Sequence, residues 1–322
     1  MKNIIQKIIE FNNKWSDPEY CLKMVKQDVS NFQYVKNQTP EICLAAVERD
    51  PDMLKYVVNQ TPEICLTAIT QNPLAFKYIK IQTPEICLIA VKIYPSILKY
   101  ISNQTLEICA TAVIENWETL EYVKIQSLEI CLAAAKQNAY ALKYIKIQTP
   151  EICLAAVKQN GNIIQFVKHQ IPEICLAAVK QNAYALQYII NQTSKICLTA
   201  IQQDPNVLIY VKNQTPEICL TAIKINPFSL MYIKNQTLKI CLTAVQQNSS
   251  VLEYVKIQTP EICMIAVKQN WKILQYIIYQ TPEICAAAIK QNSDAYMYIR
   301  LPEDEDKRDK FLRELGLLLL AT

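Results

Sequence analysis

The sequence has very few of the residues on which several kinds of catalytic and ligand-binding site depend. Its 322 residues include two glycines, Gly161 and Gly316, and one histidine, His169. Two isolated glycines exclude a glycine-rich loop that could wrap a phosphate group. A lone histidine that is expected to face solvent is seldom a general base. We therefore expect no enzymatic activity, no cofactor and no metal site.

Long apolar runs are also missing, although 51% of the residues are hydrophobic. No segment approaches the roughly 18 uninterrupted apolar residues of a membrane-spanning helix. The stretch MKNIIQKIIEFNN carries Lys7 and Glu10 inside its apolar part. It therefore predicts an amphipathic helix and not a secretory signal. We expect a cytoplasmic or nuclear protein that is not secreted and does not bind a membrane.

The cysteines define the architecture, because all of them fall in one series with a constant gap of 22 residues. A period of this size indicates a solenoid, a propeller or an array. The thirteen members are Cys21, Cys43, Cys65, Cys87, Cys109, Cys131, Cys153, Cys175, Cys197, Cys219, Cys241, Cys263 and Cys285. Alanine follows three residues later in twelve units, and glutamine seventeen residues later in twelve.

Each 22-residue unit contains two helix starts. In Thr39-Pro40-Glu41, the threonine can cap the helix, the proline fits its first position, and the glutamate suits the positive end of the helix dipole. Asp50-Pro51 repeats the signal eleven residues later. Each helix has room for about ten residues, or some 15 Å. Because helices this short are unstable alone, their stability must come from stacking.

A leucine-rich repeat is the competing interpretation of a 22-residue period. It requires a strand signature of the L-x-x-L-x-L-x-x-N type, which this sequence lacks. Apolar residues instead recur at helical spacing, as in Ile42, Cys43, Ala46 and Val47. We predict an all-α fold, an α/α solenoid or superhelix of thirteen two-helix repeats over residues 18–303, with capping helices at 1–17 and 304–322.

The two flanking segments depart from the repeat and carry apolar residues that could cover its ends. Terminal repeats need such caps, because an uncapped end exposes the core. The proposed covering residues are Ile4, Ile5, Ile8, Ile9 and Phe11 at one end and Phe311, Leu312, Leu315 and Leu318 at the other.

The string LAAVKQNAYALQYI at 176–189 closely resembles a short helical repeat that is abundant in giant DNA viruses, with relatives in some bacteria. That family is a domain of unknown function with the core L-A-A-V-K-Q-N-G-x-A-L-x-Y. Residues 154–161 match it, including Gly161, whereas most units here place Pro, Ala, Ser or Trp at the glycine. The resemblance covers residues 18–303. It implies a viral origin and a helical stack, and it brings no catalytic residues.

Most of the regularly repeated residues are expected to be structural. Stacked helices lie about 8–10 Å apart, which exceeds the roughly 4.4–6.8 Å between the Cα atoms of a disulfide. No C-x-x-C spacing suggests a metal site. The cysteines are therefore predicted to be buried. The Gln38-type glutamines are predicted to bond helix-end carbonyls and one another, and the Asn72-type residues to cap the second helix.

One surface differs from the rest of the chain in charge. Whereas 33 basic and 29 acidic residues give the whole chain a net charge of +4, the outward positions assigned to the second helices carry 14 basic residues and five acidic ones. The residue nine positions after each cysteine varies freely there. The predicted binding surface consists of Lys55, Lys77, Lys80, Lys99, Lys124, Tyr140, Lys143, Lys146, Tyr184, Phe228 and Lys272.

Two interpretations of this surface remain open. A solvated lysine face keeps a repeat protein soluble and explains the pattern without any ligand. Alternatively, exposed aromatic side chains among lysines form a recognition surface. The predicted function is a non-catalytic, virus-encoded scaffold that binds an acidic protein partner of the host or the virus, in the host cytoplasm or nucleus. The alternative function is binding of an RNA or DNA backbone along the same face.

Overall fold

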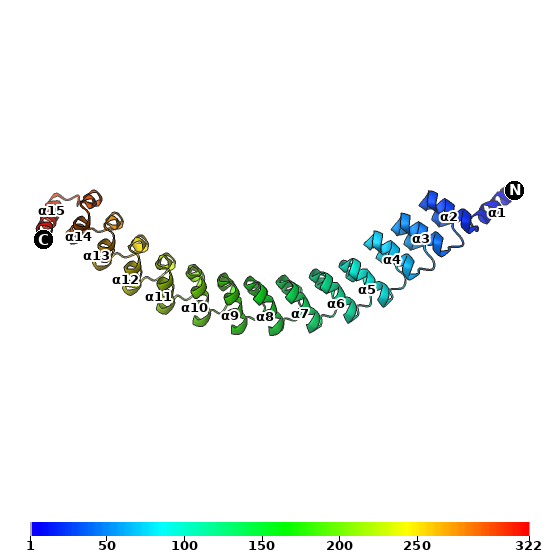
Figure 1. Ribbon diagram of the computed structural model, residues 1–322, viewed down its shortest axis with the longest axis horizontal. Helices are drawn as coiled ribbons and strands as arrows, with labels where there is room; N and C mark the ends of the chain where they lie inside the picture. Colours follow the sequence, from blue (N-terminus) through cyan, green and yellow to red (C-terminus); the bar gives the residue numbers. More distant parts are fainter. Residues whose placement is uncertain (1, 322) are drawn as a thin grey trace. The chain divides into compact units, whose positions relative to one another are not determined.

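The computed structural model describes residues 2–321, apart from the side chains of Lys2, Asn3 and Ile8. Within this range the regular elements are α-helices and 3-10 helices, and there is no strand. One α-helix followed by one 3-10 helix makes up each repeat (Figure 1). The predicted all-α solenoid of 22-residue repeats is thereby confirmed.

The α-helices are α1 (Lys2–Lys14), α2 (Pro18–Gln27), α3 (Pro40–Arg49), α4 (Pro62–Gln71), α5 (Pro84–Ile93), α6 (Leu106–Glu115), α7 (Leu128–Gln137), α8 (Pro150–Gln159), α9 (Pro172–Gln181), α10 (Ser194–Gln203), α11 (Pro216–Ile225), α12 (Leu238–Gln247), α13 (Pro260–Gln269), α14 (Pro282–Gln291) and α15 (Glu305–Leu320). The 3-10 helices are η1 (Val29–Tyr34), η2 (Pro51–Tyr56), η3 (Pro73–Tyr78), η4 (Pro95–Tyr100), η5 (Trp117–Tyr122), η6 (Ala139–Lys143), η7 (Gly161–Phe166), η8 (Ala183–Tyr188), η9 (Pro205–Tyr210), η10 (Pro227–Tyr232), η11 (Ser249–Tyr254), η12 (Trp271–Tyr276) and η13 (Ser293–Tyr298).

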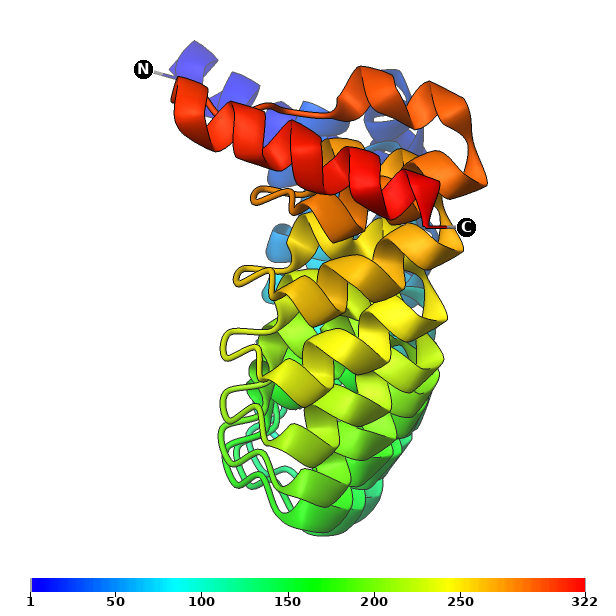
Figure 2. The same cartoon turned by 90° about the vertical axis from the view of Figure 1, so that its left-hand side faces the viewer.

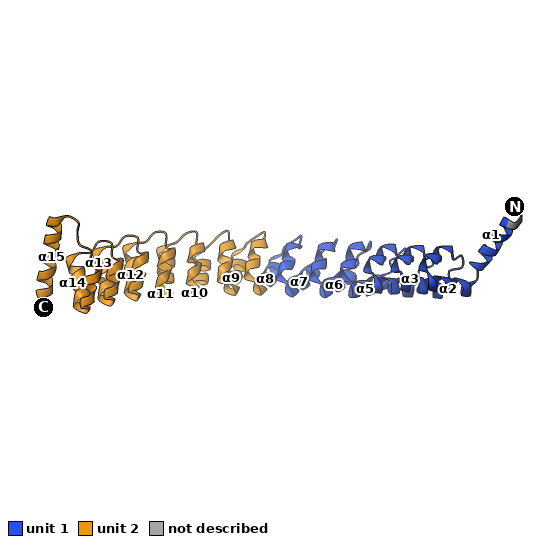
Figure 3. Ribbon diagram, turned by 90° about the horizontal axis from the view of Figure 1, so that it is seen from above, with its two compact units in different colours: residues 1–156 blue, residues 157–322 orange. Residues whose placement is uncertain are grey.

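The chain divides into two compact units, residues 1–156 and residues 157–322, and the division falls within α8 (Figure 3). The α-helices contact one another in sequence from α2 to α7 in the first unit and from α9 to α15 in the second, and consecutive 3-10 helices within each unit also touch. Figure 2 shows the α-helices of the second unit side by side, with the turns between repeats gathered along one edge.

Most of the repeated α-helices begin and end as their sequence predicts, and α3 is an example. The Thr39 hydroxyl accepts a hydrogen bond from the Ile42 N–H at 3.4 Å, and Pro40 occupies the first helical position. At the other end, the Asp50 N–H donates to the Ala46 carbonyl. The Asp50 carboxylate then accepts from the Asp52 N–H at 2.9 Å. A single residue therefore ends one helix and caps the next, which leaves no room for a loop between them.

The second helix of the repeat is shorter and tighter than we predicted. In place of about ten residues it usually has six, and in place of α-helical geometry it is a 3-10 helix. The Met53 N–H donates to the Asp50 carbonyl at 2.9 Å, and the Val57 N–H donates to Leu54 at 3.2 Å. Such i→i+3 bonding is common in short helical segments. As a result, Lys80-type residues, fifteen positions after the cysteine, lie on the following turn and not on the helix.

The core is a continuous row of small and branched side chains between the two helices of each repeat. Cys43, Ala46 and Val47 from α3 are buried, as are Leu54 in η2 and Val57 just after it. The same positions are buried in the later repeats except the last, where Ile289 and Ile299 are half-buried and Tyr296 is exposed. Because each repeat buries these side chains against its neighbour, the repeats stabilise one another.

The two flanking helices differ in how well they cover the repeats beside them. Phe311 and Leu315 of α15 are buried, and α15 packs against α14. At the other end, Phe11 approaches Tyr34 with 6.2 Å between ring centroids, but Ile4 and Ile5 remain exposed. Phe11, Ile9 and Leu312 are exposed as well. The prediction that these five side chains cover the ends is therefore wrong, and the side chain of Ile8 lies outside the described residues.

Gly161 allows an unusually close approach between two repeats. A Cβ atom at this position would lie 2.4 Å from the Ala178 carbonyl oxygen in α9. The Gly161 N–H donates to the Gln181 side chain, with 2.6 Å between the two heavy atoms. The corresponding position carries proline, alanine, serine or tryptophan in most other repeats. A glycine is therefore needed here because of the local spacing of η7 and α9.

Candidate functional site

The glutamine seventeen residues after each cysteine holds consecutive repeats together. Gln214 donates through Nε2 to the carbonyls of Leu208 at 3.1 Å and Tyr232 at 3.0 Å. Its Oε1 accepts from the Lys234 N–H at 2.9 Å. The predicted bonds to helix-end carbonyls are confirmed. The predicted bond to the next glutamine is wrong, because each side chain binds the neighbouring backbone instead.

The lysines on the turns complete this backbone bonding. The Lys212 ammonium donates to the carbonyls of Ile189 at 3.1 Å and Ile190 at 2.8 Å in the preceding repeat. The Lys80 ammonium reaches the Val57 carbonyl at 2.7 Å. Lys124 and Lys146 make equivalent bonds. Of the predicted binding residues, Lys80, Lys124 and Lys146 therefore act at least partly as caps of the neighbouring turn.

A second set of side chains, which the sequence did not single out, bonds the C-terminal ends of the α-helices. Gln203 donates to the Lys180 carbonyl at 2.9 Å, and Gln137 donates to Ile114 at 2.8 Å. In each case the carbonyl belongs to the preceding repeat. The recurrence of glutamine six residues after the cysteine was the signal in the sequence that could have revealed this.

The thirteen cysteines are buried free thiols, as predicted. Desolvation raises the pKa of Cys43, Cys65, Cys263 and Cys285 to about 11. Several thiols also lie near the glutamine of the preceding turn; the Cys241 Sγ, for example, lies 3.8 Å from Gln236 Oε1. Among the described residues, no group of three His, Cys, Asp or Glu side chains is placed to hold a metal ion.

Native protein is expected to resist thiol reagents at nearly all thirteen cysteines. A thiol with a pKa of about 11 carries roughly one thiolate in a thousand at pH 8, and burial also blocks the reagent. Mass spectrometry after brief treatment with iodoacetamide measures the labelling. Guanidinium chloride should make all thirteen reactive. Rapid modification of most cysteines without denaturant would contradict the buried series.

The outward side chains of the 3-10 helices form what we call the 3-10 face. Nine residues after the cysteine, Leu74, Tyr140, Tyr184 and Phe228 are exposed, as expected from their variability. Some also contact the next repeat: the Tyr184 and Tyr210 rings lie 6.1 Å apart, centroid to centroid. Asp204, which accepts a hydrogen bond from Tyr184, raises the pKa of that phenol.

The two units differ in the residues that they place on the 3-10 face. Twelve positions after the cysteine, the first unit has Lys55, Lys77, Lys99 and Lys143. At the same position the second unit has no lysine, and Ile209 and Met231 are exposed there. Lys272, at the start of η12, lies over the Trp271 ring. The predicted basic face therefore consists of a lysine-rich part in the first unit and a more apolar part in the second.

In the first unit, three lysines lie over tyrosine rings in consecutive repeats. The ammonium nitrogen lies 4.9 Å from the ring centroid in the pair Lys55–Tyr56, 4.6 Å in Lys77–Tyr78 and 4.8 Å in Lys99–Tyr100. None of these three described lysines has a carboxylate within ion-pairing distance. We call these six residues the lysine–tyrosine row. The ammonium groups of this row are exposed, and the tyrosine rings beneath them are half-exposed.

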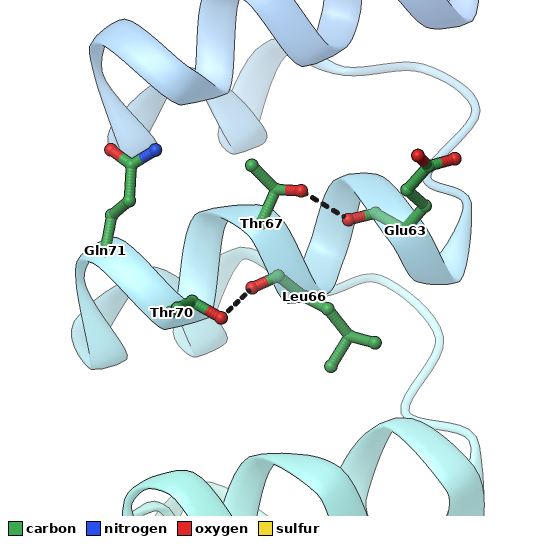
Figure 4. A pocket seen from close by; sticks show the side chains of 5 residues that line it. All are labelled: Glu63, Leu66, Thr67, Thr70 and Gln71. Atoms are coloured by element: carbon green, nitrogen blue, oxygen red, sulfur yellow. Dashed lines mark hydrogen bonds between the residues drawn. The ribbon is translucent and has the colours of Figure 1, made fainter.

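The α-helices carry a shallow hollow on the outer side of α4, lined by five residues (Figure 4). The Thr67 hydroxyl donates to the Glu63 carbonyl at 2.9 Å, and the Thr70 hydroxyl donates to Leu66 at 2.8 Å. Both hydroxyls are therefore engaged with their own helix. Glu63 is the one ionisable side chain in this lining, which gives no pair of groups for acid–base chemistry.

Two further predictions concern the single histidine and the possibility of a membrane-spanning helix. His169 is exposed on the turn after η7, as expected. None of the described helices combines the length and the apolar character needed to cross a bilayer. The 3-10 face therefore remains the one candidate site among the described residues.

Comparison with known families identifies the repeat. The family described as Domain of unknown function (DUF4116) matches six overlapping segments, which are residues 39–82, 61–107, 127–171, 149–192, 215–258 and 237–281. Comparisons with curated proteins and with solved structures found no significant match. Because the matched segments together cover more than half of the sequence, the chain belongs to the DUF4116 family of tandem repeats.

Proposed function

We propose that this chain is a non-catalytic repeat scaffold whose 3-10 face binds a protein partner. One observation supports the proposal most directly: the exposed residues of this face differ from repeat to repeat, whereas the structural contacts beneath them recur. Below them, the same caps, glutamine bonds and buried cysteines recur. An invariant frame that displays variable side chains at fixed spacing is suited to adding many weak contacts along one surface.

The partner that best suits the first unit has an acidic surface. The lysine–tyrosine row offers three exposed ammonium groups, each on a tyrosine ring that can also make apolar contacts. Tyrosine is one of the residue types enriched where binding energy concentrates. Complementary charge on the partner would raise the rate of association and fix its orientation.

We also propose that the protein is virus-encoded and acts inside the host cell. The likeness of residues 154–161 to giant-virus repeats supports the first part. Thirteen free thiols support the second, since proteins of reducing compartments keep cysteines unpaired. A host or viral protein of the cytoplasm or nucleus would then be the natural partner.

Charge reversal on the 3-10 face tests this function. In a variant with Lys55→Glu, Lys77→Glu and Lys99→Glu, we expect loss of the proteins that the wild type captures from host-cell lysate. The matched control is Lys23→Glu, Lys26→Glu and Lys92→Glu, which changes the net charge equally but on the α-helices. The control should capture the wild-type set. Identical capture by all three proteins would contradict a role for the 3-10 face.

Nucleic acid is the second candidate ligand, because exposed tyrosines beside lysines can also stack on bases and meet phosphates. This alternative predicts a gel shift of single-stranded RNA that weakens steeply with salt. It also predicts that nuclease treatment releases whatever the wild type captures. A nuclease-resistant protein complex, together with no gel shift at low salt, would reject it.

A further inference from the structure

The lysine–tyrosine row repeats at the pitch of the solenoid. Its three lysines stand twelve residues after Cys43, Cys65 and Cys87, hence at the same place in consecutive repeats. The helices that carry them, η2, η3 and η4, contact one another in turn. Packed helices are separated by about 8–10 Å. The three lysines therefore recur from one repeat to the next at about that interval.

One common backbone conformation has the same repeat length. A polyproline II helix has three residues per turn and rises about 3.1 Å per residue, so every third side chain recurs after about 9.3 Å on one side. An α-helix repeats after about 5.4 Å, and alternate residues of a strand recur after roughly 6.6 Å. Of these three, the polyproline II repeat best matches consecutive lysines of the row.

The chain itself limits the row to three lysines. In the next repeat, Glu121 occupies the equivalent position in η5, and Glu118 lies at the start of the same helix. A ligand carboxylate would be repelled there. The site therefore fits a ligand with three negative charges in register and none at the fourth position.

We propose that the lysine–tyrosine row binds an extended acidic peptide in polyproline II conformation, with a carboxylate at every third residue. This inference rests on the proposed function and adds the conformation and spacing of the partner segment. Each carboxylate would meet one lysine. Prolines between them would pack on the half-exposed rings of Tyr56, Tyr78 and Tyr100, as aromatic grooves receive proline-rich segments elsewhere.

The end of the row favours a peptide over a nucleic acid. A nucleic acid carries a phosphate at every nucleotide, so that its phosphates would continue past Lys99 to Glu118 and Glu121 of η5. A peptide can end its carboxylates at the third lysine.

Two fluorescein-labelled peptides of identical composition test the spacing. One consists of three Glu-Pro-Pro units, and the other has three glutamates followed by six prolines. Fluorescence anisotropy at low salt should show the spaced peptide binding about tenfold more tightly, because it alone meets three lysines at once. Lys77→Ala should remove most of this preference. The matched control, Lys92→Ala on α5, should retain it.

A gain-of-function variant tests the limit of the row. Glu121→Lys should tighten binding of a four-unit Glu-Pro-Pro peptide several-fold and leave the affinity for the three-unit peptide unchanged.

Equal affinity for the two isomeric peptides, with both lost on reversal of the three lysines, would overturn the proposed spacing but leave the acidic-partner face intact. Binding of neither peptide would overturn both proposals. Displacement of the spaced peptide by an equimolar single-stranded oligouridine would place nucleic acid on the row instead.

Discussion

Raising the pH from 8 to 10 in reducing buffer should lower the free energy of unfolding by several kcal/mol. Burial raises the pKa of Cys43, Cys65, Cys263 and Cys285 from an ordinary value of 9.0 to about 11. Because the folded pKa lies above the unfolded one, the stability from these thiols is fully present below about pH 9. It is lost progressively as the pH rises towards 11.

The size of this effect follows from the number of thiols. Each unit of pKa shift corresponds to about 1.4 kcal/mol. Four thiols shifted by about two units would together cost on the order of 5 kcal/mol at pH 10, which is comparable to the stability of a typical domain. The nine other cysteines, whose pKa values are also raised, add to this.

Urea unfolding at several pH values, followed by circular dichroism, measures this dependence. A variant with alanine at Cys43, Cys65, Cys263 and Cys285 serves as the control. It should start less stable at pH 7, but its free energy of unfolding should fall less steeply above about pH 9. A wild-type free energy that stays constant up to pH 10 would show that the thiols are not shielded from water.

Gln214→Ala should lower the free energy of unfolding by about 2–4 kcal/mol. The substitution removes three hydrogen bonds and leaves the carbonyls of Leu208 and Tyr232 and the N–H of Lys234 without their partner. Two of these groups belong to the next repeat, so the loss weakens the contact between repeats as well as the repeat itself. In a stacked array, such a break should also reduce the cooperativity of unfolding.

The control for this substitution is Gln202→Ala. Gln202 is the same residue type and is exposed on α10, so its loss should change stability by less than about 0.5 kcal/mol. Chemical denaturation of both variants, with the slope of the transition as a second readout, gives the comparison. Equal stabilities for the two variants would mean that the glutamine side chains do not hold the repeats together.

The α-helix of each repeat could be predicted because its signals are local. Thr39, Pro40 and Asp50 mark its beginning and end within one stretch of chain. The second helix could not be bounded in this way. After Tyr56, the residues Val57 and Val58 carry no local stop signal. Gln38, from the turn before α3, binds the Tyr56 carbonyl and the Val58 N–H and fixes the chain there. Such a contact, eighteen to twenty residues away, is invisible to helical periodicity.

The sequence predicted which residues of the candidate surface are exposed, but not which of its lysines bond the chain's own backbone. Variability between repeats located the exposed residues Leu74, Tyr184 and Phe228 correctly. It could not separate Lys77, which lies over a tyrosine ring, from Lys80, which caps carbonyls of the preceding turn. Both are lysines in a repeated pattern. Only the stacking of one repeat on the next determines which ammonium group is occupied by the chain itself.

Photo-cross-linking from defined positions tests the role of the 3-10 face most directly. Benzoylphenylalanine would replace either Leu74, exposed on η3, or Thr70, exposed on α4 of the same repeat. With a partner captured by the wild type, we predict a cross-linked complex from position 74 and little or none from position 70. Efficient cross-linking from position 70 and none from position 74 would show that the partner binds the α-helices and would contradict the account.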